Sequence, residues 1–398
     1  MEAESTGIRA AGHILCAMKV LFLTGGSPAT VFALAPLASA ARLAGHDVLL
    51  ASPEDMASVA SSVGLPVVAV TDGTMRRFMF SDRDGRPLSI PDDPRERLDF
   101  NGRGFGRLAA ASLPGLRALV ADWVPDLVVG GSLCYAAPFL AHELGVPWVR
   151  HTWDLGEPPE MDLGAAAELR PELDSLGLDG LPAADLWVDI CPPGLRGSGT
   201  GPRQGMRFVP YNQRRPLESW VLRRPERPRV CVTAGSRVSD AEETDGLREL
   251  AAGLGALGAD VVIAAPEAVA ASLRDAGGGV RAGWFALDTL LATCDLIVHH
   301  GGGQTSLTAL HAGVPQLFIP TIPKMVPPCS RVSDYGAALT LTAPRQTPAD
   351  IAAAAAELLS DPSYRERARS VSEEIARQPP PAEVVGVLEE LVGAFRAP

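Results

Sequence analysis

The chain has 398 residues, too many for one ordinary hydrophobic core and about right for two domains. Its 46% hydrophobic and 21% charged residues are typical of a globular protein, and its net charge of -12 argues against nucleic acid as a partner. The six cysteines show no CxxC spacing, and no apolar stretch is long enough to cross a bilayer. We therefore expect reduced thiols, a cytoplasmic location and no membrane partner.

The N-terminal half opens with a βαβαβ pattern, which predicts a parallel sheet. Residues 1–17 lack the cationic start and apolar region of a signal peptide, and we interpret them as a disordered extension. The predicted elements that follow are a strand at 19–25, an amphipathic helix ending at Gly45, a strand at 47–51, a helix at 54–63 and a strand at 66–70.

Residues 72–104 interrupt this pattern with many Asp, Arg, Pro and Gly residues and with aromatic side chains between them. A long loop in a compact domain is usually functional or disordered. The aromatic side chains favour a loop that closes over an apolar ligand. The candidate residues for binding such a ligand are Phe78, Phe80, Phe100, Phe105 and Tyr135.

The α/β pattern then resumes and is repeated in the second half of the chain. Residues 155–205 look irregular, with short helical pieces, and the segment 214–228, rich in Pro and Arg, is typical of an interdomain linker. The further predicted helices are 106–121, 134–144, 242–254, 267–275, 288–294, 304–312, a helical tail from Pro348 and a last helix at 381–396. The further predicted strands are 126–131, 147–151, 229–235, 260–265, 280–282, 296–300 and 316–320.

These elements predict an α/β protein with a doubly wound plan in each half. Two such domains would face each other across a cleft, which is the natural place for a ligand. The predicted boundaries are an extension at 1–17, a first domain at 18–213, a linker at 214–228, a second domain at 229–380 and a C-terminal helix at 381–398.

The segment IVHHGGGQTSLTALHAGVPQLFIP, residues 297–320, predicts an anion site. A strand that ends in glycines and feeds a helix presents free backbone N–H groups at the positive end of that helix. Gln304 and Thr305 stand at the helix start, and His300 is placed to touch the same anion. The spacing is neither a Walker A loop nor GxGxxG. A plain tight turn with capping residues is the alternative interpretation.

The same segment resembles the donor-site signature of the GT-B nucleotide-sugar glycosyltransferases. It is most similar to the actinobacterial enzymes that attach deoxysugars to polyketides and other natural-product aglycones. DLVVGGSLCYAAPFLAHELGVPWVRHTWD and AGWFALDTLLATCDLIVHHGG support the resemblance, which runs from Met18 to the C-terminus.

This resemblance implies the GT-B fold, with two Rossmann-like domains around a central cleft and a C-terminal helix that packs back towards the first domain. It implies that the first domain binds the aglycone and the second binds a nucleotide sugar, a dTDP-deoxysugar, with no further cofactor. No metal is implied, because the helix end takes the charge of the leaving group. A homodimer would be ordinary.

Residue by residue, the resemblance implies that His300, Gly302, Gln304 and Thr305 contact the donor diphosphate. The backbone around Trp284 would hold the nucleobase, and the loop after the first strand of the second domain would lie near the phosphates. The predicted donor-binding residues are Ser236, Arg237, Trp284, Phe285, Leu287, His300, Gly301, Gly302, Gly303, Gln304, Thr305, Lys324 and Met325.

Several positions depart from the family's pattern. Relatives carry a histidine, the usual general base, where this chain has Thr30, and an aspartate where it has Gly131. An Asp-Gln pair that grips sugar hydroxyls is replaced by Lys324-Met325, and a glycine of the run is replaced by Gln304. The general base and the contacts to the donor sugar are therefore open.

Three functions remain open at this point. The first is an active enzyme in which other residues replace the usual base and the usual sugar contacts. A phenolic acceptor would make this easier, because a phenol has a pKa of about 10 and needs less help from a base than an alcohol does. His151 and Asp154 in RHTWD, or Thr30 at the usual position, would then be the three main candidate bases, and Asp99 is a further, less favoured one. His151 also has a structural interpretation, because a histidine that ends a strand is often a buried, hydrogen-bonded residue.

A degenerate homologue that binds a nucleotide sugar, an aglycone or a partner transferase without turnover is the second function. Nucleotide-sugar epimerisation is the third. We predict the first: an inverting, metal-independent transfer of a deoxysugar from a dTDP-sugar to an apolar, aromatic aglycone.

Overall fold

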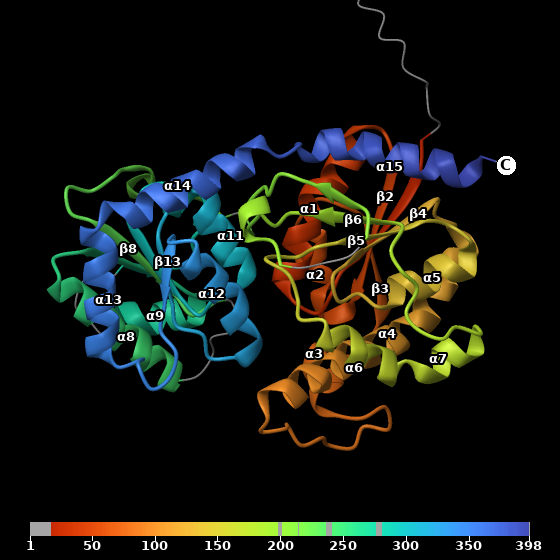
Figure 1. The fold of residues 1–398 in the computed structure, drawn as a ribbon, viewed down its shortest axis with the longest axis horizontal. Helices are drawn as coiled ribbons and strands as arrows, with labels where there is room; N and C mark the ends of the chain where they lie inside the picture. The colour runs from red at the N-terminus through yellow and green to blue at the C-terminus, as the bar shows by residue number, and fades with distance from the viewer. Residues whose placement is uncertain (1–16, 198–200, 214, 236–240, 276–280, 398) are drawn as a thin grey trace, which may run out of the picture.

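Two parallel sheets, each covered by helices on both faces, make up the protein (Figure 1). The computed structural model describes residues 17–197, 201–213, 215–235, 241–275 and 281–397. The first sheet has seven strands in the order β3-β2-β1-β4-β5-β6-β7, and the second has six in the order β10-β9-β8-β11-β12-β13. In this described part, no helix is long and apolar enough to cross a membrane.

The strands of the first sheet are short apolar runs, as expected for strands buried on both faces. β1 lies at the point where the strand order reverses, paired with β2 on one side and with β4 on the other. The strands are β1 Lys19–Leu23, β2 Asp47–Pro53, β3 Val67–Thr71, β4 Leu127–Gly131, β5 Trp148–His151, β6 Leu186–Asp189 and β7 Arg203–Gly205.

The helices of this half include two, at 75–80 and from 94 onwards, that occupy parts of the predicted loop at 72–104, while residues 81–93 between them are not helical. Thr74 caps the first of them and Asp93 caps the second, with Pro94 at the favoured first helical position. The helices are α1 Pro28–Leu43, α2 Ala57–Ser61, α3 Met75–Phe80, α4 Pro94–Asp122, α5 Ala136–Leu144, α6 Glu160–Glu168 and α7 Arg170–Ser175, with 3-10 turns η1 Glu54–Met56 and η2 Pro193–Leu195.

Two of the glycines in this segment, Gly102 and Gly104 of α4, serve helix packing, whereas Gly85, with a φ of 86°, lies in a turn between the two helices. A Cβ at Gly102 of α4 would lie 2.2 Å from the carbonyl oxygen of Met161, and one at Gly164 of α6 would lie 2.2 Å from the carbonyl oxygen of Asp99. Reciprocal glycines therefore let α4 and α6 approach closely. The prediction of one long loop was wrong for residues 75–80 and 94–104, because glycine can mark close packing as well as a turn.

The second sheet repeats the plan, with β8 between β9 and β11 at its own reversal point. Its strands are β8 Arg229–Thr233, β9 Asp260–Ala264, β10 Arg281–Gly283, β11 Leu296–His299, β12 Gln316–Phe318 and β13 Ala338–Thr340. Its helices are α8 Ala241–Ala256, α9 Glu267–Asp275, α10 Leu287–Leu291, α11 Gly303–His311, α12 Val326–Asp334, α13 Pro348–Ser360 and α14 Pro362–Arg377, with η3 Ser219–Leu222 and η4 Pro323–Met325.

The C-terminal helix α15, Pro381–Arg396, crosses back to the first half of the chain (Figure 1). It packs against α1, and Val384 and Leu388 join the core beneath that helix. Glu389 pairs with the buried His46 at 3.0 Å. The two halves are thus connected at α15 as well as through the segment at 214–228.

Candidate active site

A cavity of about 490 Å³ lies between the two sheets and is lined by residues from both halves of the chain. It is bordered by the loops that follow β1, β5, β8, β11 and β12, at the carboxyl ends of the strands. Ligands of open α/β sheets bind at this edge, where the strand order reverses. The cavity is therefore the best candidate for the active site.

The amino end of α11 opens into this cavity. Gly301 has a φ of 86°, a left-handed conformation that favours glycine, and Gly302 takes the N-cap position without a side chain that could cap the helix. The first amides of a helix have no partner within it. In the described residues no side chain caps α11, so its amino end is a ready anion site.

Two adjacent histidines shape this loop in different ways. His299 is buried, with Nε2 2.9 Å from Gln316 Oε1, and its Nδ1 accepts a 3.3 Å hydrogen bond from the Gly301 amide. Burial, together with the neighbouring His300, lowers the pKa of His299 to about 3, so its ring is neutral. His299 thus orients the loop, whereas His300 lines the cavity.

Glycines on both sides leave room for the imidazole ring of His300. A Cβ at Gly235 would lie 2.6 Å from His300 Cε1, and one at Gly302 would lie 2.6 Å from His300 Nε2. Only glycine at these two positions leaves room for the ring beside the start of α11. The predicted donor residues Ser236 and Arg237, which follow Gly235 in the sequence, lie outside the described residues.

The two walls of the cleft touch at the start of α11. The side-chain amide of Gln304 donates a hydrogen bond to the backbone carbonyl of Trp153. A Cβ at Gly303 would lie 2.2 Å from Cβ and Oδ2 of Asp154, so glycine is needed for this approach. Gln304, which we predicted at the diphosphate, lines the cavity together with Thr305, but its side-chain amide is engaged across the cleft.

The structure separates the three candidate bases. Thr30 lines the cavity, but its Oγ1 donates to the Ser27 carbonyl at 2.7 Å and accepts from the Gly25 amide at 3.1 Å. His151 is fully buried and is not part of the cavity wall. Its Nδ1 lies 2.7 Å from the Thr152 carbonyl, and burial lowers its pKa to about 4. The structural interpretation of His151 therefore replaces its assignment as a base.

Asp154 is the candidate with an ionisable side chain that lines the cavity. Its Oδ1 accepts a 3.0 Å hydrogen bond from the Gly156 amide. Burial raises the pKa of its carboxyl group to about 7, the charge of Glu157 acts in the same direction, and the charge of Lys324 opposes both. A carboxylate with this pKa accepts a proton at neutral pH more readily than an ordinary aspartate.

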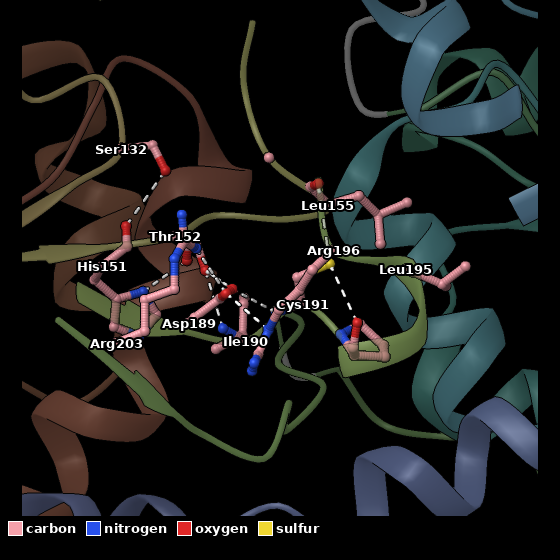
Figure 2. A network of polar contacts seen from close by, with 12 residues as sticks. Ser132, His151, Thr152, Leu155, Asp189, Ile190, Cys191, Leu195, Arg196 and Arg203 are labelled. Carbon is pink, nitrogen blue, oxygen red and sulfur yellow. Dashed lines mark hydrogen bonds and ion pairs between the residues drawn. The ribbon is translucent and has the colours of Figure 1, made fainter. Parts of the chain in front are cut away.

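A buried polar network fixes the segment that carries Asp154 (Figure 2). Thr152 donates to Asp189 Oδ1 at 3.2 Å and accepts from the Ile190 amide at 2.9 Å. Asp189 is 1% exposed and pairs with Arg203 at 2.9 Å and with Arg196 at 3.0 Å. Sequence reasoning missed Asp189, because nothing in DICPPGLR shows that it supports a loop from another strand.

Trp153 accounts for the glycine at position 131. A Cβ at Gly131 would lie 1.6 Å from Trp153 Nε1, and one at Gly25 would lie 2.9 Å from its Cη2. The indole thus fills the space in which a longer side chain at position 131 would lie. It forms part of the cavity wall beside Phe105, with 6.3 Å between the ring centroids.

Of the five residues predicted to bind an apolar ligand, Phe105 lines the main cavity. Phe78 and Phe100 are buried in helix packing, and Phe80 is exposed at the end of α3. Tyr135 is 3% exposed, and its hydroxyl donates to Asp162 at 2.7 Å. Phe78, Phe80 and Phe100 do not line the main cavity, because α3 and α4 turn them into the helical layer or out to solvent. Tyr135, at the N-cap of α5, does not line it either.

A second, smaller cavity of about 120 Å³ adjoins the first and shares Gln304 and Thr305 with it. Trp284, Phe285 and Leu287, the residues predicted near the nucleobase, line this cavity. The first half of the chain contributes Phe32 and Tyr211, whose stacked rings lie 5.9 Å apart. The aromatic walls suit a flat heterocycle next to the start of α11.

Lys324 and Met325 also line the main cavity. Lys324 Nζ lies 3.8 Å from Oε2 of Glu157, a cavity residue that sequence reasoning did not single out. Met75 of α3 belongs to the same wall. The only signal for Glu157 in the sequence was its closeness to Asp154, which does not tell which side chain faces the cleft.

This fold and cleft define the class of the protein, which is that of the GT-B glycosyltransferases. The chain belongs to the erythromycin biosynthesis protein CIII-like family, whose N-terminal domain matches residues 39–235 and whose C-terminal domain matches residues 248–391. It is 36% identical over 370 residues to the L-demethylnoviosyl transferase of Streptomyces niveus, covering 92% of this chain and 96% of that protein.

Further relatives agree with this assignment. The 3-alpha-mycarosylerythronolide B desosaminyl transferase of Saccharopolyspora erythraea is 29% identical, covering 96% of this chain and 100% of its own. The structure of the Streptomyces sp. SF2575 glycosyltransferase SsfS6 with thymidine diphosphate has a TM-score of 0.84 at 34% identity, covering 94% of this chain and 99% of that one. Spinosyn rhamnosyltransferase SpnG with spinosyn aglycone has a TM-score of 0.82 at 27% identity, covering 94% and 100%.

Proposed function

We propose that this chain is an inverting, metal-independent glycosyltransferase that moves a deoxysugar from a dTDP-sugar to an apolar, aromatic natural-product aglycone. Residues 18–213 would bind the aglycone, and residues 229–380 would bind the donor. The observation that carries the proposal is the uncapped amino end of α11, which opens into a cavity shared by both halves. The names of the relatives support the choice of thymidine diphosphate and of a natural-product acceptor.

The residues at the cleft suit direct displacement at the anomeric carbon. The acceptor hydroxyl attacks that carbon, the bond to the diphosphate oxygen breaks, and Asp154 takes the hydroxyl proton. The amides at the start of α11 and His300 stabilise the departing diphosphate without a metal ion. Met75, Phe105 and Trp153 offer the acceptor an apolar wall. A phenolic acceptor fits a carboxylate base, because its pKa of about 10 lies far below that of an alcohol.

The test of this function is a transfer assay with the purified protein. The protein is incubated with a dTDP-deoxysugar and a panel of phenolic aglycones, and released dTDP and new glycoside are measured together. Stoichiometric appearance of both supports the proposal. Binding of dTDP without release from any donor–acceptor pair would favour the degenerate, non-catalytic alternative instead.

Replacing His300 by alanine is expected to weaken dTDP binding by at least about 10-fold, because the anion loses one hydrogen bond at the start of α11. Isothermal titration calorimetry with dTDP measures the change. His142→Ala, at an exposed position of α5, is the matched control and should bind dTDP like the unmodified protein. An unchanged dissociation constant in His300→Ala would remove the donor site from this loop.

A further inference from the structure

We propose that Glu157 and Lys324 form a polar clamp for the sugar ring of the donor, with one residue supplied by each wall of the cleft. The clamp rests on the proposed function, because it requires a nucleotide sugar at the start of α11. It goes further by naming the residues that distinguish one hexose from another. Glu157 stands on the wall opposite the rest of the donor site.

The backbone brings these two residues together from distant parts of the chain. β11 and β12 pair in parallel, with His299 beside Phe318, so the loops that follow the two strands lie next to each other. Lys324 lies in η4, within the second of these loops. Glu157 lies between β5 and α6, in the segment that also carries Asp154. Both side chains therefore line the cavity beside the start of α11.

The pair leaves much of its hydrogen-bonding capacity unused. A separation of 3.8 Å between Lys324 Nζ and Glu157 Oε2 is an ion pair, but it is too long for a hydrogen bond. The two side chains are only 27% and 11% exposed, and in the described part of the chain neither makes a hydrogen bond. Charged groups that are withdrawn from water and lack hydrogen bonds are costly, so this pair is poised for a polar ligand.

A sugar hydroxyl matches the chemistry of this pair. A carboxylate only accepts hydrogen bonds and an ammonium group only donates them, whereas a hydroxyl group does both. Neighbouring hydroxyls of a hexose would satisfy both side chains. Because the charges of the pair cancel, a neutral sugar is not repelled.

The position of the pair also favours the sugar over the other parts of the donor. A single oxygen joins the sugar to the diphosphate, so the sugar must lie close to the start of α11, where Gly303 meets Asp154. The cavity that suits the nucleobase is lined by neither Glu157 nor Lys324. The clamp is therefore on the sugar side of the donor.

Contacts between the two halves hold the segment that carries Glu157 against the second domain. Gln304 holds the carbonyl of Trp153, and Arg331 donates to the carbonyl of Leu155, so the segment before Glu157 is docked onto the second domain. A donor that lacks the matching hydroxyl would bind through its nucleotide but leave both charges unsatisfied. Sites built around such polar groups discriminate strongly against analogues that lack the partner.

The test measures binding of dTDP, dTDP-glucose and dTDP-rhamnose to the full-length protein by isothermal titration calorimetry. For each protein, the ratio of the dTDP dissociation constant to that of each nucleotide sugar isolates the contribution of the sugar. We expect Glu157→Gln and Lys324→Met each to lower this ratio for the preferred sugar by roughly 10-fold. The dTDP constant itself should change by less than about 2-fold, and the preference between the two sugars should shrink.

Glu160→Gln is the matched control, because Glu160 starts α6 close to Glu157 but does not line the cavity. Melting curves establish that the variants fold, and a folding defect in one of them still leaves the variant on the opposite wall. Unchanged ratios, equal weakening of dTDP and of both sugars, or no contribution of either sugar in the unmodified protein would each overturn the clamp. A complete lack of dTDP binding to the unmodified protein would instead overturn the proposed function.

Discussion

Replacing Asp154 by asparagine is expected to lower kcat by about 10²- to 10⁴-fold, the usual contribution of a general base. The substitution keeps the size of the side chain and its hydrogen bond to Gly156, so dTDP binding should change little. Steady-state transfer kinetics measure the loss. Asp99→Asn, in an exposed ion pair with Arg103, is the matched control and should keep the rate of the unmodified protein.

The transfer rate is expected to depend on pH through the ionisation of Asp154. As the proposed base, Asp154 would react as the carboxylate, and its pKa is raised to about 7. Activity should therefore rise with pH through about 7 and then level off, whereas the residual activity of Asp154→Asn should lack this step. Glu157, Lys324 and Arg331 are the charged groups that face the carboxyl group. Because Lys324 lowers the pKa of Asp154, Lys324→Met should move the midpoint to higher pH. A profile without this step in the unmodified protein would exclude Asp154 as the base.

Adding a methyl group at Gly303 is expected to cause the second largest loss of kcat, after Asp154→Asn. In Gly303→Ala, the new Cβ would lie 2.2 Å from Cβ and Oδ2 of Asp154, far inside van der Waals contact. Either the segment carrying Asp154 moves away or the cleft fails to close. Misplacement of a reacting group by about 1 Å can cost roughly 10²-fold in rate, and we expect a loss of at least that size in kcat.

The stability of Gly303→Ala should stay close to that of the unmodified protein, because alanine favours a helix and the clash involves the opposite wall of the cleft. Gly253→Ala is the control, since a Cβ at that position of α8 meets nothing within 4 Å. Transfer kinetics and thermal melting separate the two effects. Full activity in Gly303→Ala would show that the contact between Gly303 and Asp154 is not part of the working site.

Much of the fold was predictable because its signals are local. Short apolar runs alternating with amphipathic helices predicted the strands from β1 to β5 and from β8 to β12. The predictions failed where the signal was weak or ambiguous. β6 and β7 lie in a segment that looked irregular, and the short strand β13 was missed. The glycines of α4 suggested a loop, but in the structure they allow α4 and α6 to pack closely.

The candidate site was predictable in part for the same reason. The start of α11 is a property of one short segment, and the sequence placed His300 and the glycine run there. The acceptor wall depends on how α3, α4 and the segment after β5 pack together. Consequently Phe105 was placed in the cavity, but Phe78 and Phe100 point into the helical layer, and Met75 and Trp153 were missed.

By itself, the sequence determined the two-domain α/β architecture and the anion site at residues 301–305, because strand, glycine and helix preferences act between neighbours in the chain. Only the tertiary structure decided that Asp154 rather than His151 faces the cleft, and that Glu157 meets Lys324. The direction of a side chain beyond the end of a strand depends on what holds the following loop. Here that support comes from Asp189 on another strand and from the opposite domain.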